Sequence, residues 1–206
     1  MPDLTKRDKI LDALQQLLLE KSIQHISVSE IAREAGMGKG SIYYYFPSKD
    51  AIIDALVERS YQQPIQTAKT LAAQTEVSAF TRMAMLFQAC RNSSAAFSHH
   101  NHYSPISTSA QGIAFLHHKY LNHLISELKP ALTEIITQAI ERGESHFDYP
   151  AALAEIVLIV LAVKLDNSLV PSTLEETEET LKGLISLLEK GTDVPAGTLG
   201  YMTLIK

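Results

Sequence analysis

Residues 27–49 read SVSEIAREAGMGKGSIYYYFPSK, and this stretch decides the fold. It opens with Ser27, and Glu30 follows three residues later, which is the spacing of a capping box. In that motif the serine side chain accepts a hydrogen bond from the backbone amide of the glutamate, and the glutamate side chain reaches back to the backbone amide of the serine. The spacing therefore predicts a helix over residues 28–35.

A glycine separates this helix from the next one. Gly36 can adopt the left-handed backbone conformation that ends a helix, and Pro47 cannot continue one, so a short helix is predicted over residues 39–46. An apolar stripe upstream predicts a first helix over about residues 5–20. Two helices joined by a glycine-containing turn are the arrangement of helix-turn-helix modules, which place their second helix in the major groove of DNA.

The short helix has two faces. Ile42 and Phe46 lie four residues apart, so both can pack on the first two helices, and Tyr45 can share that role in part. The side chains left to point outward are Lys39, Ser41, Tyr43 and Tyr44. Amino and hydroxyl groups of this kind bind phosphate oxygens and base edges, and Gly40 lets a DNA backbone come close. The pattern favours a DNA-binding surface.

Residues 27–49 resemble the N-terminal domain of the TetR family of transcriptional regulators, and the similarity extends through residues 50–56. The resemblance implies an all-α fold and a homodimer. Each subunit would have a three-helix, helix-turn-helix DNA-binding domain, residues 1–48, and a larger helical ligand-binding and dimerisation domain, residues 49–206.

The resemblance also implies which residues meet DNA. They are Ser27, Ser29, Lys39, Gly40, Ser41, Tyr43, Tyr44, Tyr45 and Lys49. Lys39 and Lys49 would supply ionic phosphate contacts. Ser29 is too short to reach a base as a long basic side chain would. Recognition of the DNA sequence is therefore expected to depend mainly on Lys39, Ser41, Tyr43 and Tyr44.

Beyond residue 50 the pattern stays helical, and no strand alternation of useful length occurs. Helices are expected over residues 113–128, 131–140, 150–164 and 174–190. Pro64 is expected to kink its helix or to end the first part of it, and Pro130 to separate or bend the helices around it. Glycine and proline residues from Gly191 to Gly200 predict a loose tail.

The helix over residues 150–164 is apolar almost all round, which is too much for a lone surface helix. Pairing with the last helix and with the symmetry mates of both would bury it in a four-helix dimer interface, as the resemblance also implies. The interface residues would be Ile156, Ile159, Val160, Val163, Leu181, Leu184, Ile185 and Leu188. The alternative is that this helix lies at the centre of a monomer.

Seven of the eight histidines fall after residue 50. His99 and His102, three residues apart, suggest a zinc or copper site as one hypothesis. Cys90 is the single cysteine, so no metal site is assigned, and histidines that are solvated or line a pocket are the favoured interpretation. If several of them line a pocket, they would bind a polar or anionic effector together with Tyr103 and Lys119. The candidate ligand-binding residues are Met83, Phe87, His99, His102, Tyr103, Phe115 and His118.

Length and composition bound these interpretations. The 206 residues allow one large domain or a small domain joined to a larger one, and the net charge is −5. Residues 1–50 carry seven basic and seven acidic side chains, so the prediction of DNA binding depends on the motif and not on charge. The longest apolar run, residues 156–163, is far shorter than the roughly 18 residues of a membrane span. Without a signal peptide, a cytoplasmic location is expected.

These features predict a ligand-responsive DNA-binding regulator, a repressor that binds a pseudo-palindromic operator as a dimer and is released by a small-molecule effector. No enzyme activity, cofactor or membrane partner is expected. Two alternatives stay open at this point. One is a histidine-based metal-binding protein or metalloenzyme with an incidental helix-turn-helix, and the other is a DNA-binding scaffold whose larger domain binds only protein. The effector, the operator and the choice between repression and activation are not encoded in any recognisable motif.

Overall fold

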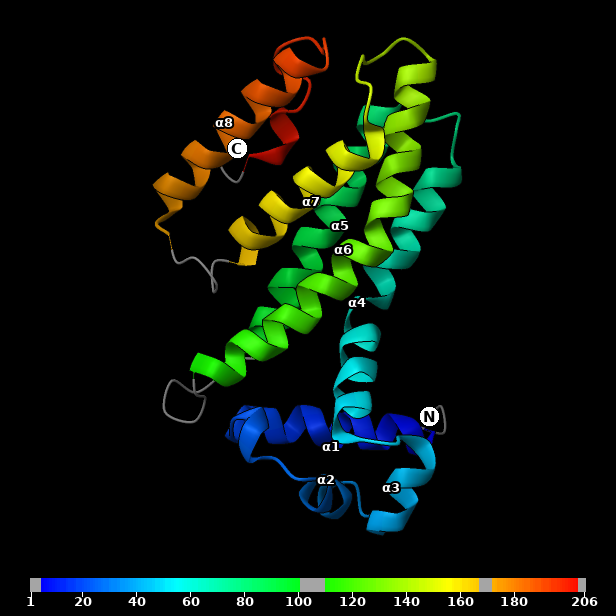
Figure 1. The fold of residues 1–206 in the computed structure, drawn as a ribbon, viewed down its shortest axis with the longest axis vertical. Coiled ribbons are helices and arrows are strands. Elements are labelled where there is room, and N and C mark those ends of the chain that lie inside the picture. The colour runs from blue at the N-terminus through cyan, green and yellow to red at the C-terminus, as the bar shows by residue number, and fades with distance from the viewer. Residues whose placement is uncertain (1–4, 101–109, 167–171, 204–206) are drawn as a thin grey trace. The chain divides into compact units, whose positions relative to one another are not determined.

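The computed structural model describes residues 5–100, 110–166 and 172–203 (Figure 1), and it describes the backbone alone for residues 64, 90–100, 110–117, 120, 165 and 166. Every regular element in these ranges is a helix, so the predicted all-α class is confirmed. The elements are α1 (Lys6–Glu20), η1 (Ile23–His25), α2 (Val28–Glu34), α3 (Lys39–Tyr45), α4 (Lys49–Ala73), α5 (Ala79–His100), α6 (Ala110–Glu141), α7 (Pro150–Asp166), α8 (Leu174–Gly191) and η2 (Gly200–Met202).

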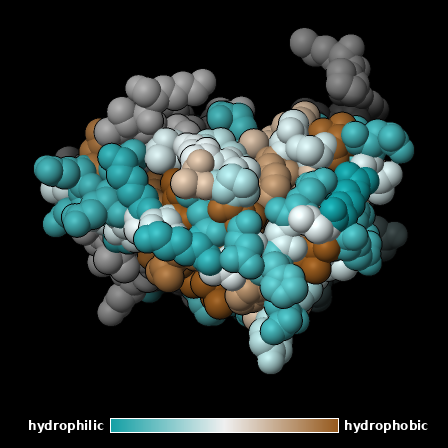
Figure 2. Space-filling model, turned by 90° about the horizontal axis from the view of Figure 1, so that it is seen from above, coloured by the Kyte–Doolittle hydropathy of each residue, from teal (hydrophilic) through white to brown (hydrophobic). Residues whose placement is uncertain are grey.

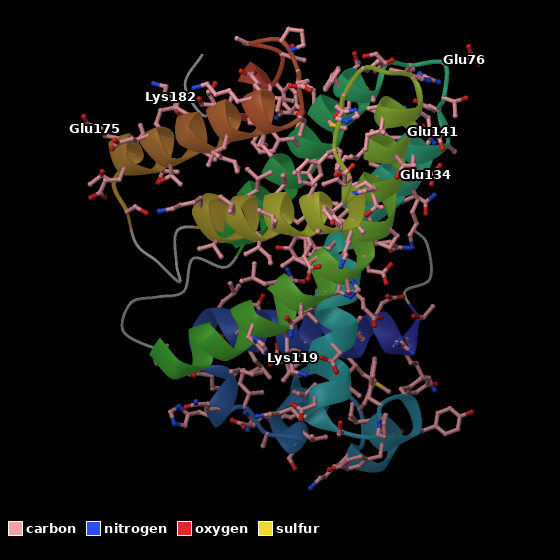
Figure 3. All side chains as sticks on the ribbon, turned by 45° about the horizontal axis from the view of Figure 1, so that its top comes forward. Glu76, Lys119, Glu134, Glu141, Glu175 and Lys182 are labelled. Atoms are coloured by element: carbon pink, nitrogen blue, oxygen red, sulfur yellow. The ribbon has the colours of Figure 1, made fainter. Side chains whose placement is uncertain are left out.

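The chain forms two compact units. The first comprises residues 1–62 and 95–123, and the second comprises residues 63–94 and 124–206. In the first unit, the Lys119 ammonium of α6 donates to the Asp54 carboxylate of α4 at 2.7 Å, and Figure 3 labels Lys119 on its helix. The first unit therefore includes turns of α4 and α6 as well as the three N-terminal helices. The functional division between residues 48 and 49 stays a prediction.

The first unit is built around a core of isoleucine and leucine side chains. Ile10 and Leu14 of α1, Ile31 of α2, Ile42 of α3 and Ile53 of α4 are all completely buried. Each lies on the apolar stripe of its helix, so burial of these stripes holds the short helices α2 and α3, which are too short to be stable alone. The core fixes which face of α3 is left to solvent.

Helix α6 is continuous with Pro130 inside it, so of the two predicted alternatives the separation is wrong and the bend stays a prediction. Pro130 itself is exposed, while Leu128 and Leu132 on either side are buried. An internal proline removes one helical hydrogen bond, and burial of the opposite face supplies the stabilisation that keeps the helix intact. The same holds for α4, which continues past residue 64 to Ala73.

A buried arginine joins three parts of the second unit. The Arg82 side chain on α5 is fully buried, and its Nη1 atom donates to the backbone carbonyls of Leu71 and Ala72 at 3.4 and 3.3 Å. The same atom donates to Oε1 of Gln138 on α6 at 2.5 Å. Burial lowers the pKa of Arg82, because it removes water from the charged group. Arg82 thus satisfies carbonyls at the C-terminal end of α4, where a helix leaves them without partners.

The predicted loose tail is wrong, because the chain after α8 folds back on the second unit. Val194, Leu199 and Met202 are each less than a tenth exposed. The glycines of this segment suggested an irregular tail. Gly197 instead has a φ of +90°, a conformation that turns the chain, and the short helix η2 follows it. In Figure 1 the red η2 lies beside α8. The apolar residues between the glycines therefore belong to the core.

Gly36 provides a first test of the fold. Its φ is +65°, so Gly36→Ala is expected to lower the free energy of unfolding by about 1–2 kcal/mol, the cost of placing a side chain in the left-handed region. Urea denaturation measures this. Gly40→Ala is the control, because a Cβ there meets nothing within 4 Å and the residue lies in a helix, so this variant should be as stable as the original or slightly more so. Equal losses in both variants would contradict the role of the Gly36 backbone.

Candidate DNA-binding surface and ligand cavity

The predicted capping box at the start of α2 is present. The Glu30 amide donates to Oγ of Ser27 at 3.2 Å, and the Ser27 amide donates to Oε2 of Glu30 at 2.8 Å. Lys21 also donates to the Glu30 carboxylate. The Lys21 ammonium first, and then the Ser27 backbone and side chain, lower the pKa of Glu30 to about 2. This carboxylate stays ionised at neutral pH and fixes where α2 begins.

The turn between α2 and α3 is a Schellman motif. The Met37 amide donates to the Ala32 carbonyl at 2.8 Å, and the Gly36 amide donates to the Arg33 carbonyl at 3.1 Å. Gly38 then caps α3 through its backbone, since its carbonyl accepts from the Ser41 amide at 2.9 Å. Four residues, 35–38, therefore connect α2 to α3, and the first amides of α3 have no partner within the helix.

The outward face of α3 carries the residues predicted to bind DNA. Tyr44 is 84% exposed and Tyr43 is 48% exposed, whereas Ile42 and Phe46 are buried, as predicted. Tyr45 is half-buried against the core, also as predicted, and its ring meets the edge of the Tyr44 ring at a centroid distance of 5.1 Å. The other exposed members of the predicted set are Ser27, Ser29, Lys39, Gly40 and Ser41. Exposed tyrosine side chains are typical of a binding surface, where the hydroxyl forms hydrogen bonds with polar groups of the partner.

Lys49 has a place that the sequence did not suggest. Its side chain is part-buried, and Nζ donates to the backbone carbonyls of Ile23 and Ile26 at 2.8 and 2.9 Å. Both carbonyls belong to the segment around η1 that leads into α2. Two of the three donors of this ammonium therefore hold the protein's own backbone, which leaves one for a phosphate.

The second unit contains an almost wholly apolar cavity of about 90 Å³. Its walls come from α5, α6, α7, α8, the folded tail and Ser145 in the segment between α6 and α7. No described residue that lines it is charged, and the polar side chains among them are those of Ser145, Thr192 and Tyr201. Burial raises the pKa of the Tyr201 hydroxyl, which stays protonated at all physiological pH values. The cavity can hold an uncharged molecule.

Two of the predicted ligand-binding residues, Met83 and Phe87, line this cavity. His118 does not; it is exposed on the part of α6 that belongs to the first unit, where its Nε2 lies 3.1 Å from Nδ2 of Asn122. The side chains of His99, His102, Tyr103 and Phe115 lie outside the described residues. None of the histidine side chains that the structure describes lines the cavity, so they give no support to a polar or anionic effector there.

Sequence reasoning missed most of the cavity wall. Leu199, Tyr201 and Met202 contribute from the tail, and Leu153 and Leu161 contribute from α7. A cavity is assembled from residues far apart in the chain, and no local spacing marks it. The one available signal was the presence of large apolar residues among the glycines of the tail.

Two further searches were confined to the described residues. No group of three or more histidine, cysteine, aspartate or glutamate side chains among them is placed to hold a metal ion. None of the helices in the same ranges has the length and apolarity needed to cross a membrane.

The predicted dimer interface divides into outward and inward parts. On α7, Ile156 is 52% exposed and Ile159 is 44% exposed, and Val160 and Val163 are half-buried. On α8 the predicted stripe faces the interior of the same chain, where Leu181, Ile185, Leu184 and Leu188 lie in or against its core or cavity. The large apolar side chains that α8 exposes are instead Leu174, at 61%, and Leu187, at 73%.

Two helices joined by a glycine-containing turn, the second of them with an exposed face, define a helix-turn-helix domain. Residues 10–56 match the model of the family described as "Bacterial regulatory proteins, tetR family". The N-terminal domain is therefore similar to that of this family, and the predicted resemblance is confirmed over these residues.

Individual relatives match the same region. The chain is 42% identical over 53 residues to the uncharacterized HTH-type transcriptional regulator YvdT of Bacillus subtilis, covering 26% of this chain and 27% of that protein. It is 36% identical over 63 residues to the HTH-type transcriptional regulator EthR of Mycobacterium tuberculosis, covering 31% of this chain and 29% of that protein. The matches thus span under a third of the length of these two relatives.

The whole fold has a solved counterpart. SmeT, the repressor of the Stenotrophomonas maltophilia multidrug efflux pump SmeDEF, has a similar structure with a TM-score of 0.70. The similarity covers 97% of this chain and 96% of SmeT, at 14% sequence identity. At this identity the likeness shows the fold alone, which has the predicted N-terminal helix-turn-helix and larger helical domain.

Proposed function

We propose that this protein is a ligand-responsive transcriptional regulator, a repressor that binds a pseudo-palindromic DNA operator as a homodimer and is released by a small-molecule effector. The observation that carries the proposal is the exposed face of α3, where Tyr43 and Tyr44 stand beside Lys39, Gly40 and Ser41 behind a glycine-containing turn. Base edges and phosphates satisfy such side chains. Its place of action is the compartment that holds the DNA.

The names of the relatives agree with this function. YvdT and EthR are named transcriptional regulators, and SmeT is named the repressor of an efflux pump. Their shared segment is the DNA-binding head, which supports DNA binding by this chain. Repression and release by an effector are proposed from the cavity, because a ligand that prefers one conformation shifts the population toward it.

We assign the dimer surface to the outward faces of α7 and α8. Ile156 and Ile159 of α7 and Leu187 of α8 are large apolar side chains left in solvent by a single subunit. A two-fold axis would bring each face against its own copy, and burial of these side chains would drive the association. Leu181 and Ile185 stabilise the subunit itself in this arrangement. Two heads held in one dimer read two half-sites.

The experiment that tests the function is selection of genomic DNA fragments by the purified protein at a fixed, stated salt concentration, followed by measurement of the mass of the complex. One short inverted repeat bound by a dimer is the expected result. Release of that DNA by a compound would then identify effectors. An intact dimer that enriches no sequence would contradict the proposal, and metal content of the purified protein would be the next measurement, since it tests the histidine-based alternative.

Lys39 and Lys49 are expected to act differently, although both were predicted to bind phosphate. Lys39→Ala removes an exposed cation from α3, so the slope of log K for DNA against log salt should fall by about 0.9, with stability unchanged. Lys49→Ala removes two hydrogen bonds to carbonyls and is expected to lower the free energy of unfolding by about 1.5–3 kcal/mol. Fluorescence anisotropy over a salt series and urea denaturation separate the two. If Lys49→Ala is as stable as the original protein and has a reduced salt slope, Lys49 acts mainly as a phosphate contact and this expectation is wrong.

A further inference from the structure

The cavity of the second unit is closed in part by the C-terminal segment, residues 192–203, which we call the cover. Five of its side chains line the cavity, including Leu199, Tyr201 and Met202. The opposite walls are helical, with Phe87 of α5 and Leu161 of α7 among them. The Tyr201 ring packs edge-on against the Phe87 ring at a centroid distance of 6.2 Å.

Few polar contacts fasten the cover, and one residue of α8 makes two of them. The Val194 amide donates to the Glu189 carbonyl, and the Leu199 amide donates to Oε1 of the Glu189 side chain, both at 2.9 Å. The His146 amide donates to the Thr192 carbonyl at 2.8 Å. Seen from this end of the protein, polar residues surround scattered hydrophobic ones (Figure 2). The cover is thus held to α8 by backbone and side-chain hydrogen bonds and to the cavity by its buried apolar side chains.

The lining decides the chemistry of the occupant. Because none of the described lining residues carries a charge, an ionised ligand would lose its hydration and gain no counter-ion. Ser145 and Tyr201 offer hydroxyls for at most a neutral polar group, since the Thr192 hydroxyl already donates to the Leu188 carbonyl at 2.7 Å. The other lining side chains are apolar, so they favour contact with the hydrocarbon part of a ligand.

The volume decides the size. A protein cavity of about 150 Å³ lined by apolar side chains stays dry and binds benzene, so the cavity of about 90 Å³ found here matches a smaller group. We propose that it binds a small neutral molecule, or the neutral end of a larger one, built on an aliphatic chain of about three or four carbons, and that the cover residue Met202 sets the length accepted. That such a molecule is the effector of the protein rests on the proposed function.

The first test compares 1-butanol with butanoate at pH 8, two probes of the same chain length that differ in charge. Dissociation constants are measured on the full-length dimer without DNA, by ligand-observed NMR titration. The alcohol is expected to bind at least about tenfold more tightly, because the carboxylate finds no cation in the wall. Equal affinities, or no binding of the alcohol at concentrations up to its solubility, would overturn the proposal.

The second test changes the cover. Met202→Ala removes three heavy atoms from a residue that is 3% exposed, so 1-heptanol should gain about tenfold or more over 1-butanol relative to the original protein. Met85→Ala is the matched control, because Met85 is 49% exposed on α5 and does not line the cavity. An unchanged preference in the Met202 variant, or the same change in both variants, would overturn the assignment. Circular dichroism checks that each variant folds. If Met202→Ala does not fold, Leu161→Ala, which enlarges the cavity from the opposite wall, is used in the same test.

The tests are independent of DNA binding. If the genomic selection enriches no sequence but the alcohol binds as expected, the proposed regulatory function is contradicted and the proposed ligand class still holds. If the selection succeeds but the alcohol and the carboxylate bind equally, the proposed ligand class is contradicted and the regulatory function still holds. Release of the selected DNA by 1-butanol but not by butanoate would show that the ligand site controls DNA binding.

Discussion

Ile159→Glu is expected to separate the proposed dimer into folded monomers. The side chain is 44% exposed on α7 of one subunit, so a charge there costs the isolated subunit little. In the dimer the same carboxylate would face its own copy across the two-fold axis, desolvated and without a partner, and the dimer dissociation constant should rise by about 100-fold or more. Light scattering after size-exclusion chromatography measures the mass directly.

Loss of the dimer should also abolish operator binding. Two linked heads gain a large factor from effective concentration, about 100-fold or more, which a single head lacks. Met85→Glu on α5 is the control, since it adds the same charge at an exposed apolar residue outside the proposed surface and should leave both mass and affinity unchanged. A dimeric Ile159→Glu protein would show that another face joins the subunits.

Arg82→Ala is expected to produce the largest loss of stability of any single change proposed. The substitution empties a fully buried site and removes the donor that satisfies the carbonyls of Leu71 and Ala72 and the Gln138 amide oxygen. The free energy of unfolding should fall by about 3–5 kcal/mol, combining the cavity with the lost hydrogen bonds. Urea denaturation followed by circular dichroism gives the value.

Two variants show which part of Arg82 matters. Arg82→Met keeps most of the volume and removes the charge, and because a buried cation is costly to desolvate, it should cost only about 1 kcal/mol. Arg59→Ala removes an exposed ion pair with Asp12, at 2.7 Å, and should also cost at most about 1 kcal/mol. Equal losses for Arg82→Met and Arg82→Ala would show that the hydrogen bonds, and not the filled volume, hold this end of α4.

The head could be predicted because its signals are local. A serine and a glutamate three residues apart start α2, and Gly36 ends it, so neighbouring residues alone define the turn and the start of α3. The spacing of Ile42 and Phe46 then identified the buried face and, by exclusion, the outward one. Lys49 shows the limit, since its carbonyl partners Ile23 and Ile26 lie more than twenty residues away.

The second unit could be predicted only as helices. An apolar stripe such as the one through Leu181 and Ile185 says that a surface is buried, and says nothing of whether the same chain or a partner covers it. Pro130 by itself favours the end of a helix, and the glycines of the cover by themselves favour an irregular chain. Packing against residues distant in the sequence outweighs both local preferences. The cavity is lined by six segments that are far apart in the chain, and only the folded chain brings them together.

The two faces of α7 have a thermodynamic consequence. Leu153, Val157 and Leu161 line the cavity, while Ile156 and Ile159 on the other side belong to the proposed dimer surface. One rigid helix then separates a ligand from a partner subunit by its own diameter, so a shift that suits one alters the fit of the other. By linkage, the apparent affinity for the ligand should depend on protein concentration, and the ligand should change the dimer dissociation constant by the same factor.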